Sequence, residues 1–204
     1  MNQRLSNLTR SESPDEPTWD IAMLFPNQGS WSEEEYLALD TNHLVEFSQG
    51  HLEILEMPTI SHQETLAYLY GVLLAWATQG KLGKVLFAPV KVRLWPGTFR
   101  EPDLVFMRTE NRSRIGEQFW EGADLVMEVV SKDRHHDYEI KRAEYAKAGI
   151  LEYWIVDPLE KKITVLWLDG GQYAVHGEFR EGEQSTSLLL PGLTVDVERA
   201  FVQS

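Results

Sequence analysis

The sequence predicts an α/β (α+β) fold in which a central mixed β-sheet is flanked by helices, and two observations support this prediction. Short apolar segments of strand length recur from residue 43 onward, bounded by Gly, Pro, Asn and Asp. Two longer segments, residues 61–80 and 137–148, instead combine helical spacing with recognisable helix ends. We therefore expect about seven or more strands and two principal helices.

The length and composition indicate a single domain. With 204 residues, 43% of them hydrophobic, the chain can bury one well-formed core but is short for two. Residues 1–18 are rich in Ser, Asn, Asp and Glu, which predicts a flexible N-terminal lead. The single domain is then expected to span residues 19–204.

The first part of this domain is predicted to contain two helices and an N-terminal β-hairpin. Ser32 is a suitable N-cap for the helix in "SWSEEEYLAL", because acidic residues fill its first turn. The segments "HLVEFSQG" and "HLEILEMP" are short strands joined around Gly50. The clearest helix, residues 61–80, begins with a capping box of Ser61 and Glu64 and ends at a glycine.

The second part carries most of the expected sheet. The segment "DLVMEVV", residues 124–130, is apolar on both faces, as is typical of a central strand covered on both sides. The helix of residues 137–148 ends at Gly149, and "DGG" predicts a C-terminal β-hairpin. Further strands are predicted at residues 84–95 with an interruption at Pro89, 102–107, 152–158, 161–168 and 172–179, and the tail 191–203 predicts a short strand with one helical turn.

The composition also restricts where the protein works. There are no cysteines, so disulfides and thiolate ligands are excluded, which fits a reducing compartment. The N-terminus "MNQRLSNLTRSESPDEPTWD" lacks the apolar core of a signal peptide, and no apolar segment is long enough to span a bilayer. We expect a soluble, cytoplasmic protein without a membrane partner.

The net charge of −13 argues against a broad nucleic-acid-binding surface, because phosphate neutralisation supplies much of the affinity for nucleic acids. Basic residues gather locally at 108–114 and 132–136, where they form either a phosphate-facing patch or an exposed polar loop. His135 and His136 are adjacent but have no third ligand nearby in the sequence, so we do not expect a transition-metal site there.

Two acidic residues enter segments that are otherwise apolar. Glu128 lies inside the strand 124–130, and Asp103 follows Pro102 at the start of "LVFM". A buried carboxylate is costly unless it is paired or binds a metal ion. If the two strands are neighbours, a hard divalent cation with oxygen ligands would offset both charges.

Lys141 is also expected to face the sheet. On a helical wheel it lies within about 60° of Tyr145 and Ala148, which are reasonable core-facing residues. Helical side chains tilt toward the N-terminus of their helix, and here that end follows the strand of Glu128. Lys141 is therefore expected to approach Glu128.

The residues alone leave two interpretations of this pair. In the first, Glu128 and Lys141 form a buried ion pair that fixes the packing of the helix on the sheet. In the second, Asp103 and Glu128 hold Mg²⁺ while Lys141 orients a water for phosphodiester hydrolysis. Glycoside hydrolysis by paired carboxylates is a third possibility, but it gives the lysine no role.

The ordered segments "EPDLVFM" and "DLVMEVVSKDRHHDYEIKRAEYAKAGILEYWIVDP" resemble the Uma-type restriction endonuclease family of the PD-(D/E)XK nuclease superfamily. The resemblance runs from about Ser32 to Val197. It implies a restriction-endonuclease-like core, a metal site on two adjacent strands, and Asp103 and Glu128 as its acids. The superfamily pattern places a lysine at the position where this chain has Val130. In this family the resemblance implies that the lysine comes instead from the following helix, where Lys141 is the matching position.

The same resemblance extends to further positions. It matches Glu46, as an outer metal ligand or simply a strand-end acid, and His62, at a helix start. Ser131 and Asp137 also match, although Ser131 is equally suited to turning the chain and Asp137 to pairing with Lys141. Tyr145 is predicted to serve in packing rather than catalysis.

The family therefore implies a Mg²⁺-dependent DNA endonuclease, with Mn²⁺ as an alternative ion and a homodimer as its assembly. Its catalytic residues would be Asp103, Glu128, Lys141 and Glu46, of which Asp103 and Glu128 bind the metal. The alternative is a catalytically inactive nuclease-fold protein that serves in binding or assembly and keeps Glu128–Lys141 as a structural pair.

Overall fold

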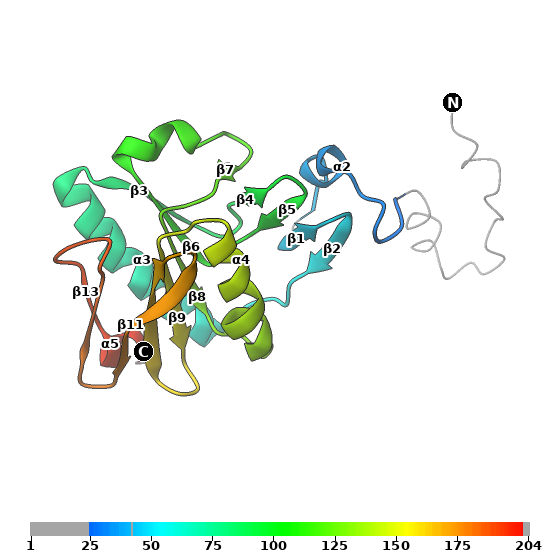
Figure 1. Cartoon of the computed structure of the whole chain (residues 1–204). Coiled ribbons are helices and arrows are strands. Elements are labelled where there is room, and N and C mark those ends of the chain that lie inside the picture. Colours follow the sequence, from blue (N-terminus) through cyan, green and yellow to red (C-terminus); the bar gives the residue numbers. More distant parts are fainter. Residues whose placement is uncertain (1–24, 42, 202–204) are drawn as a thin grey trace, which may run out of the picture.

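The structure is a computed structural model that describes residues 25–41 and 43–201 (Figure 1). The lead predicted for residues 1–18 lies outside the described residues. The described elements form an α/β architecture with two large sheets flanked by helices. The predicted fold class is therefore confirmed.

The larger sheet is mixed and has six strands in the order β11-β10-β9-β8-β6-β3. Strands β8 and β9 are parallel, and every other neighbouring pair is antiparallel. Its strands are β3 (Gly83–Phe87), β6 (Leu104–Arg108), β8 (Leu125–Val129), β9 (Glu152–Asp157), β10 (Lys162–Asp169) and β11 (Gln172–Arg180).

The second sheet has five strands in the order β2-β1-β5-β4-β7. They are β1 (Val45–Ser48), β2 (His51–Ile54), β4 (Val92–Trp95), β5 (Thr98–Arg100) and β7 (Trp120–Glu121). The predicted strands therefore divide between two sheets instead of joining one. The chain leaves the larger sheet after β3, where Pro89 cannot donate to a strand ladder, and β4 then pairs with β5.

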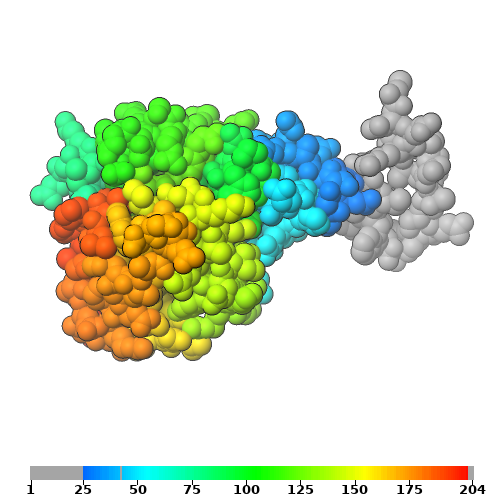
Figure 2. All heavy atoms as spheres, viewed as in Figure 1, coloured from blue at the N-terminus to red at the C-terminus, as the bar shows by residue number. Residues whose placement is uncertain are grey.

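Both predicted hairpins are present. Strands β1 and β2 form the N-terminal hairpin around Gly50, and β10 and β11 form the C-terminal hairpin around Gly170 and Gly171. Beyond β11, a small sheet of β12 (Gln184–Thr186) and β13 (Thr194–Asp196) leads into the short helix α5 (Val197–Phe201). The hairpin β1–β2 lies at one end of the molecule, beside the short helix α2 (Glu33–Leu37) (Figures 1 and 2).

Helices cover both faces of the six-stranded sheet. Helix α3 (Ile60–Gly80) places Leu69 and Leu73 in one core cluster with Leu125 and Met127 of β8. Helix α4 (Lys141–Lys147) lies on the opposite face, where Tyr145 joins the cluster that contains Val126. Strand β8 is thus central and buried on both faces, as its sequence predicts, and Glu128 shares the α4 face with Val126.

The predicted helix starts are partly correct. Ser32 is the N-cap of α2 and forms a complete capping box with Glu35. For α3, however, the predicted Ser61 cap is wrong, because the extended residue Thr59 is the N-cap and its hydroxyl accepts from the backbone N–H of His62 at 3.2 Å. The helix therefore begins at Ile60, one residue before Ser61, and His62 lies in its first turn.

The helix predicted for residues 137–148 is irregular at its beginning. Residues His136–Ile140 form a π-helical turn, η3, which continues directly into α4. Such wide turns are uncommon and occur frequently at functional sites. Here the turn places Asp137 and Lys141 against the same end of β8. No helix among the described residues is both long and apolar enough to cross a membrane.

Candidate active site

The two predicted acids meet between β6 and β8. Asp103 directly precedes β6, whose residue Leu104 pairs with Met127 of β8, so Asp103 lies beside Glu128. The Asp103 backbone N–H donates to Glu128 Oε2 at 3.4 Å, and Asp103 Oδ2 accepts from the backbone N–H of Val129 at 2.8 Å. The antiparallel register of β6 and β8 therefore brings both carboxylates to one place.

Lys141, the first residue of α4, reaches Glu128. Its Nζ lies 3.1 Å from Glu128 Oε2, 3.4 Å from Asp137 Oδ1 and 3.9 Å from Glu46 Oε1. The Lys141 side chain is 7% exposed, so this ammonium group is buried among three carboxylates. Lys141 thus lies on the face of the helix that the helical spacing predicts.

Glu46 joins the cluster from the second sheet, on β1. It is fully buried, and its Oε1 accepts from the backbone N–H of Glu101 at 3.2 Å. Its Oε2 lies 3.5 Å from Arg100 Nε and 3.5 Å from His136 Nε2, yet it finds no hydrogen-bond partner among the described residues. The packing of the two sheets thus adds a third acid to the predicted pair.

Tyr145 packs in the core and also contacts the acidic cluster. Its ring contacts Tyr153 edge-on, as expected for a core residue, but its hydroxyl also donates to Glu128 Oε1 at 2.5 Å. Asp137 is fixed in turn by the backbone N–H of Ser131, which donates to Asp137 Oδ2 at 3.2 Å. These contacts hold the carboxylates around Lys141 in place.

His62 approaches Asp103 from the start of α3. Its Nε2 lies 3.1 Å from Asp103 Oδ2, so Asp103 is contacted by both β8 and α3. Burial lowers the pKa of His62, but the hydrogen bond to Asp103 and the charges of Asp103 and Glu128 outweigh it and raise this pKa above its usual value. The Asp103 and His62 side chains are 16% and 14% exposed, so solvent reaches the cluster at this edge.

The cationic neighbours of Glu46, Arg100 and His136, were not predicted from the sequence. Arg100, on β5, is buried and binds Glu144 of α4 through two hydrogen bonds of 2.7 Å each. His136 contacts Glu46 from η3. These contacts join segments far apart in the chain, and the sequence offers no local signal for them beyond a buried-strand position for Arg100.

The crowding of carboxylates changes their proton affinities. Burial raises the pKa of Glu128 to about 8, and the charges of Asp103 and Asp137 act in the same direction, against the lowering effect of Lys141. Burial would likewise raise the pKa of Glu46, but Lys141, His136 and Arg100 lower it to about 2. Burial lowers the pKa of Lys141, yet its acidic neighbours raise it well above its usual value.

Negative charge is in excess in this connected network. Two permanent cations, Lys141 and Arg100, contact four carboxylates, those of Glu128, Glu46, Asp137 and Glu144. Two further carboxylates, of Asp103 and Glu53, adjoin the same network through Glu128 and His136. Carboxylate oxygens are the donors that hard divalent cations prefer. The excess of acids around Asp103 and Glu128 therefore fits a site for divalent metal.

Glu101, two residues before Asp103, provides a test of how burial affects stability. It accepts from the Val45 backbone N–H at 3.1 Å, and burial raises its pKa from 4.5 to about 7. The folded state therefore retains a proton that the unfolded state releases, and this contribution to stability is lost as the pH rises from about 4.5 through about 7.

We expect Glu101→Gln to remove that loss. From pH 5 to pH 8, the wild type should lose on the order of 1–3 kcal/mol of unfolding free energy that the variant keeps. Urea unfolding of both proteins at the two pH values measures the difference. If the unfolding free energy changed equally with pH in both proteins, Glu101 would ionise normally in the folded state.

Arginines in both predicted basic clusters form ion pairs with acidic side chains. Arg108 pairs with Glu110 and Asp124 at 3.2 and 3.6 Å. In the second cluster, Arg134 pairs with Asp157 and Glu160. At least one arginine of each cluster is therefore paired with acids, which supports the exposed-loop interpretation.

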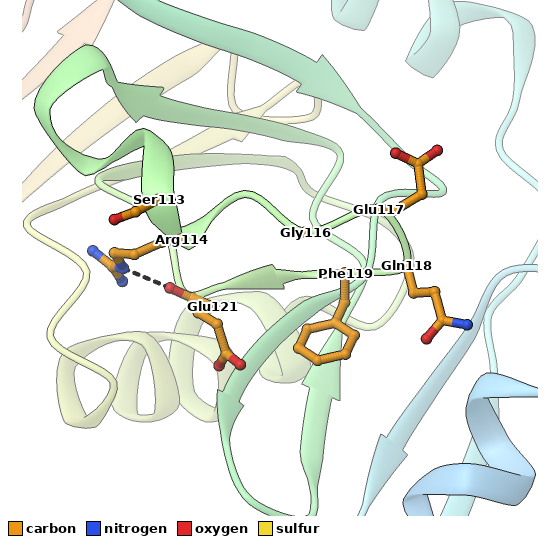
Figure 3. Close-up of a pocket in the computed structure, with 7 residues that line it drawn as sticks. All are labelled: Ser113, Arg114, Gly116, Glu117, Gln118, Phe119 and Glu121. Atoms are coloured by element: carbon orange, nitrogen blue, oxygen red, sulfur yellow. Dashed lines mark hydrogen bonds between the residues drawn. The ribbon is translucent and has the colours of Figure 1, made fainter.

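A surface pocket lies beside the first basic cluster, between Ser113 and Glu121 (Figure 3). Within it, Arg114 donates to the backbone oxygen of Glu121 at 2.7 Å, and Phe119 contributes an apolar side chain. None of the acidic cluster residues lines this pocket. It is therefore separate from the candidate active site.

Comparisons with known proteins show the family and the fold of this chain. Residues 33–198 match the Uma2 family model, described as "Putative restriction endonuclease". A crystal structure of a "putative nuclease" from Anabaena variabilis ATCC 29413 superimposes with a TM-score of 0.69 at 15% sequence identity, covering 84% of this chain and 97% of that one. That similarity shows a shared fold. No curated protein matches the chain. Since the family model spans most of the sequence, the chain belongs to the Uma2 family.

Proposed function

We propose that this protein is a Mg²⁺-dependent DNA endonuclease of the cytoplasm that hydrolyses phosphodiester bonds, with Mn²⁺ as an alternative ion. One observation carries the proposal. Glu128 lies 3.1 Å from the Lys141 ammonium group and accepts the backbone N–H of Asp103 at 3.4 Å, and Glu46 lies 3.9 Å from the same ammonium group. A protein without catalytic function has little reason to bury these groups together, because each is costly to remove from water.

Asp103 and Glu128 are the residues that would hold the metal ion. When bound, a divalent cation polarises the scissile phosphate and lowers the pKa of a coordinated water. The protein supports Asp103 through the Val129 backbone N–H and His62, and supports Glu128 through the Tyr145 hydroxyl. Such supporting contacts fix the orientation of ligating carboxylates.

Lys141 has two tasks in this proposal. Its ammonium group orients the attacking water by hydrogen bonding, and it stabilises negative charge that develops on the phosphate oxygens. Asp137 and Glu46, 3.4 and 3.9 Å from Nζ, keep the group charged and aimed at the site. DNA would approach at the edge where Asp103 and His62 are partly exposed. Because the protein is acidic overall, its contacts with DNA would be confined to this edge.

One observation favours a second function. Lys141 and Glu128 already form a direct 3.1 Å ion pair, and both Glu128 oxygens have protein partners. A catalytically inactive nuclease-fold protein would keep this pair to fix α4 against β8, and would serve in binding or assembly. The two functions differ in whether the acids bind metal.

Calorimetric titration of Mg²⁺ and Mn²⁺ distinguishes them. We expect saturable binding to wild type that is lost in both Asp103→Asn and Glu128→Gln. Glu181→Gln, which alters an exposed acid paired with Lys161, is the matched control and should bind like wild type. Absence of binding to wild type, with and without a DNA duplex, would leave the structural pair as the role of Glu128 and Lys141.

We also propose a homodimer as the assembly, since two copies would present one site to each strand of a duplex. Strand β11 ends the six-stranded sheet, and its Val175 is 56% exposed, which makes this edge the candidate contact. Sedimentation equilibrium of wild type and Val175→Lys measures the assembly. A monomeric wild type at assay concentrations would contradict the proposal.

A further inference from the structure

A second group of potential metal ligands lies beside the proposed catalytic cluster, where hairpin β1–β2 meets η3. It consists of Glu46, Glu53 and His136, and one ligand atom from each lies within 4.8 Å of the others. Glu46 and Glu53 are direct partners in the β1–β2 register, so they project from the same face of the hairpin. His136 then approaches both of them from the first position of η3.

Two carboxylates directly opposite each other in an antiparallel pair repel one another unless a cation lies between them. Arg100 is 3.5 Å from Glu46 Oε2, but it is already engaged by Glu144 through two shorter hydrogen bonds of 2.7 Å. Lys141 faces the other oxygen, Oε1, at 3.9 Å. The side of Glu46 that faces Glu53 therefore lacks a strongly bound cation within the described structure.

Two buried atoms at this place have no hydrogen-bond partner in the part of the chain that the structure describes. They are Oε2 of Glu46, which is fully buried, and Nε2 of His136, a residue 9% exposed. The two atoms face each other at 3.5 Å, and His136 Nδ1 lies 3.5 Å from Glu53 Oε1. A protonated histidine that bridged the carboxylates would be expected to make shorter, charge-assisted contacts of about 2.7–2.9 Å.

We propose that Glu46, Glu53 and His136 form a second metal site, which binds a borderline divalent transition-metal ion such as Zn²⁺. One imidazole with two carboxylates is a donor set suited to such ions, whereas Mg²⁺ and Ca²⁺ favour oxygen ligands alone. The Glu53 side chain is 52% exposed, which gives the ion a path from solvent and leaves room for water ligands.

The proposed site also gives a role to one of the two adjacent histidines, His136. The other two ligands, Glu46 and Glu53, come from the distant hairpin β1–β2. His135, in contrast, is exposed and outside the ligand group. The second site does not depend on the nuclease proposal, although Glu46 lies between the two clusters and contacts both.

Co²⁺ is the probe that tests this site, because its visible absorption reports coordination by protein ligands, and Zn²⁺ serves as competitor. The titration uses the full chain carrying Asp103→Asn and Glu128→Gln, so that binding at the proposed catalytic acids does not contribute. We expect one equivalent of Co²⁺ to bind with a change in the visible spectrum, and Zn²⁺ to displace it.

In the same background, His136→Gln should abolish the signal and Glu53→Gln should weaken binding at least about tenfold. His135→Gln is the matched control and should bind as its parent does. Glu53 is half exposed, so its variant remains informative even if His136→Gln fails to fold. No spectral change in the parent, unchanged binding in Glu53→Gln, or loss in His135→Gln would each overturn the site, whatever the outcome of the nuclease assay.

Discussion

Replacing Lys141 by methionine is expected to lower the rate of DNA cleavage by at least about 100-fold. Methionine is apolar and of similar length, so the main change is loss of the ammonium group that lies 3.1 Å from Glu128 Oε2. In the proposed mechanism this group orients water and stabilises charge on the phosphate. A single-turnover cleavage assay with excess enzyme measures the effect on the chemical step.

The same variant should still bind Mg²⁺, as tightly as wild type or more so. Lys141 and a metal ion compete for the carboxylate of Glu128, so removal of the lysine charge favours the ion. A merely structural lysine would not produce this combination of slower cleavage and preserved metal binding. Calorimetry on wild type and variant, at matched pH, provides the second measurement.

Lys147→Met is the control for this experiment. Lys147 lies on the same helix, α4, but it is exposed and contacts the ring of Trp95 instead of the acidic cluster. It should cleave DNA like wild type. Because Lys141→Met leaves several carboxylates without their cation, its folded fraction must be checked by thermal unfolding. Full cleavage activity in a folded Lys141→Met protein would show that the reaction does not need the Lys141 ammonium group.

The position of Lys141 was predictable because it follows from two local periodicities. Strand alternation put Glu128 on one face of β8, and helical spacing put Lys141 on the inner face of α4. The connection between them is short, so the two faces had to meet. Asp103 was less constrained by local pattern, and its place beside Glu128 depended on the resemblance and on β6 pairing with β8.

The contacts of Glu46 were not predictable in the same way. They depend on how the second sheet packs against η3 and α4, which brings Arg100 and His136 to one carboxylate. No periodicity relates residues on β1, β5 and η3. The Thr59 cap of α3 was missed for a different reason, since Thr59 and Ser61 are both good caps and the choice depends on the backbone before the helix.

Glu152 offers the largest expected effect on stability, at a place remote from the acidic cluster. It is fully buried in β9, and its carboxylate accepts hydrogen bonds from the Trp154 indole, the Ser187 hydroxyl and two backbone N–H groups, those of Leu188 and Leu189. These bonds hold the segment before β13, which delivers further leucines to the core beside α3.

Glu152→Ala is therefore expected to lower the unfolding free energy by roughly 3–5 kcal/mol, because it leaves several buried donors without an acceptor and detaches this segment. Glu152→Gln should be intermediate, since its amide offers one acceptor oxygen where the carboxylate has two. Urea unfolding measures both variants. Glu178→Ala, on the neighbouring hairpin and half exposed beside Lys162, is the control and should cost about 0–1 kcal/mol.

The Glu152 variants also separate stability from the proposed chemistry. Glu152 belongs to the face of the sheet that packs against α3, whereas Glu128 and Lys141 lie on the α4 face. The folded fraction of Glu152→Gln should thus bind Mg²⁺ as wild type does, although it unfolds at lower urea. If metal binding weakened in proportion to the lost stability, the acidic cluster would depend on the C-terminal segment, and the two faces of the sheet would be coupled through β8 and β9.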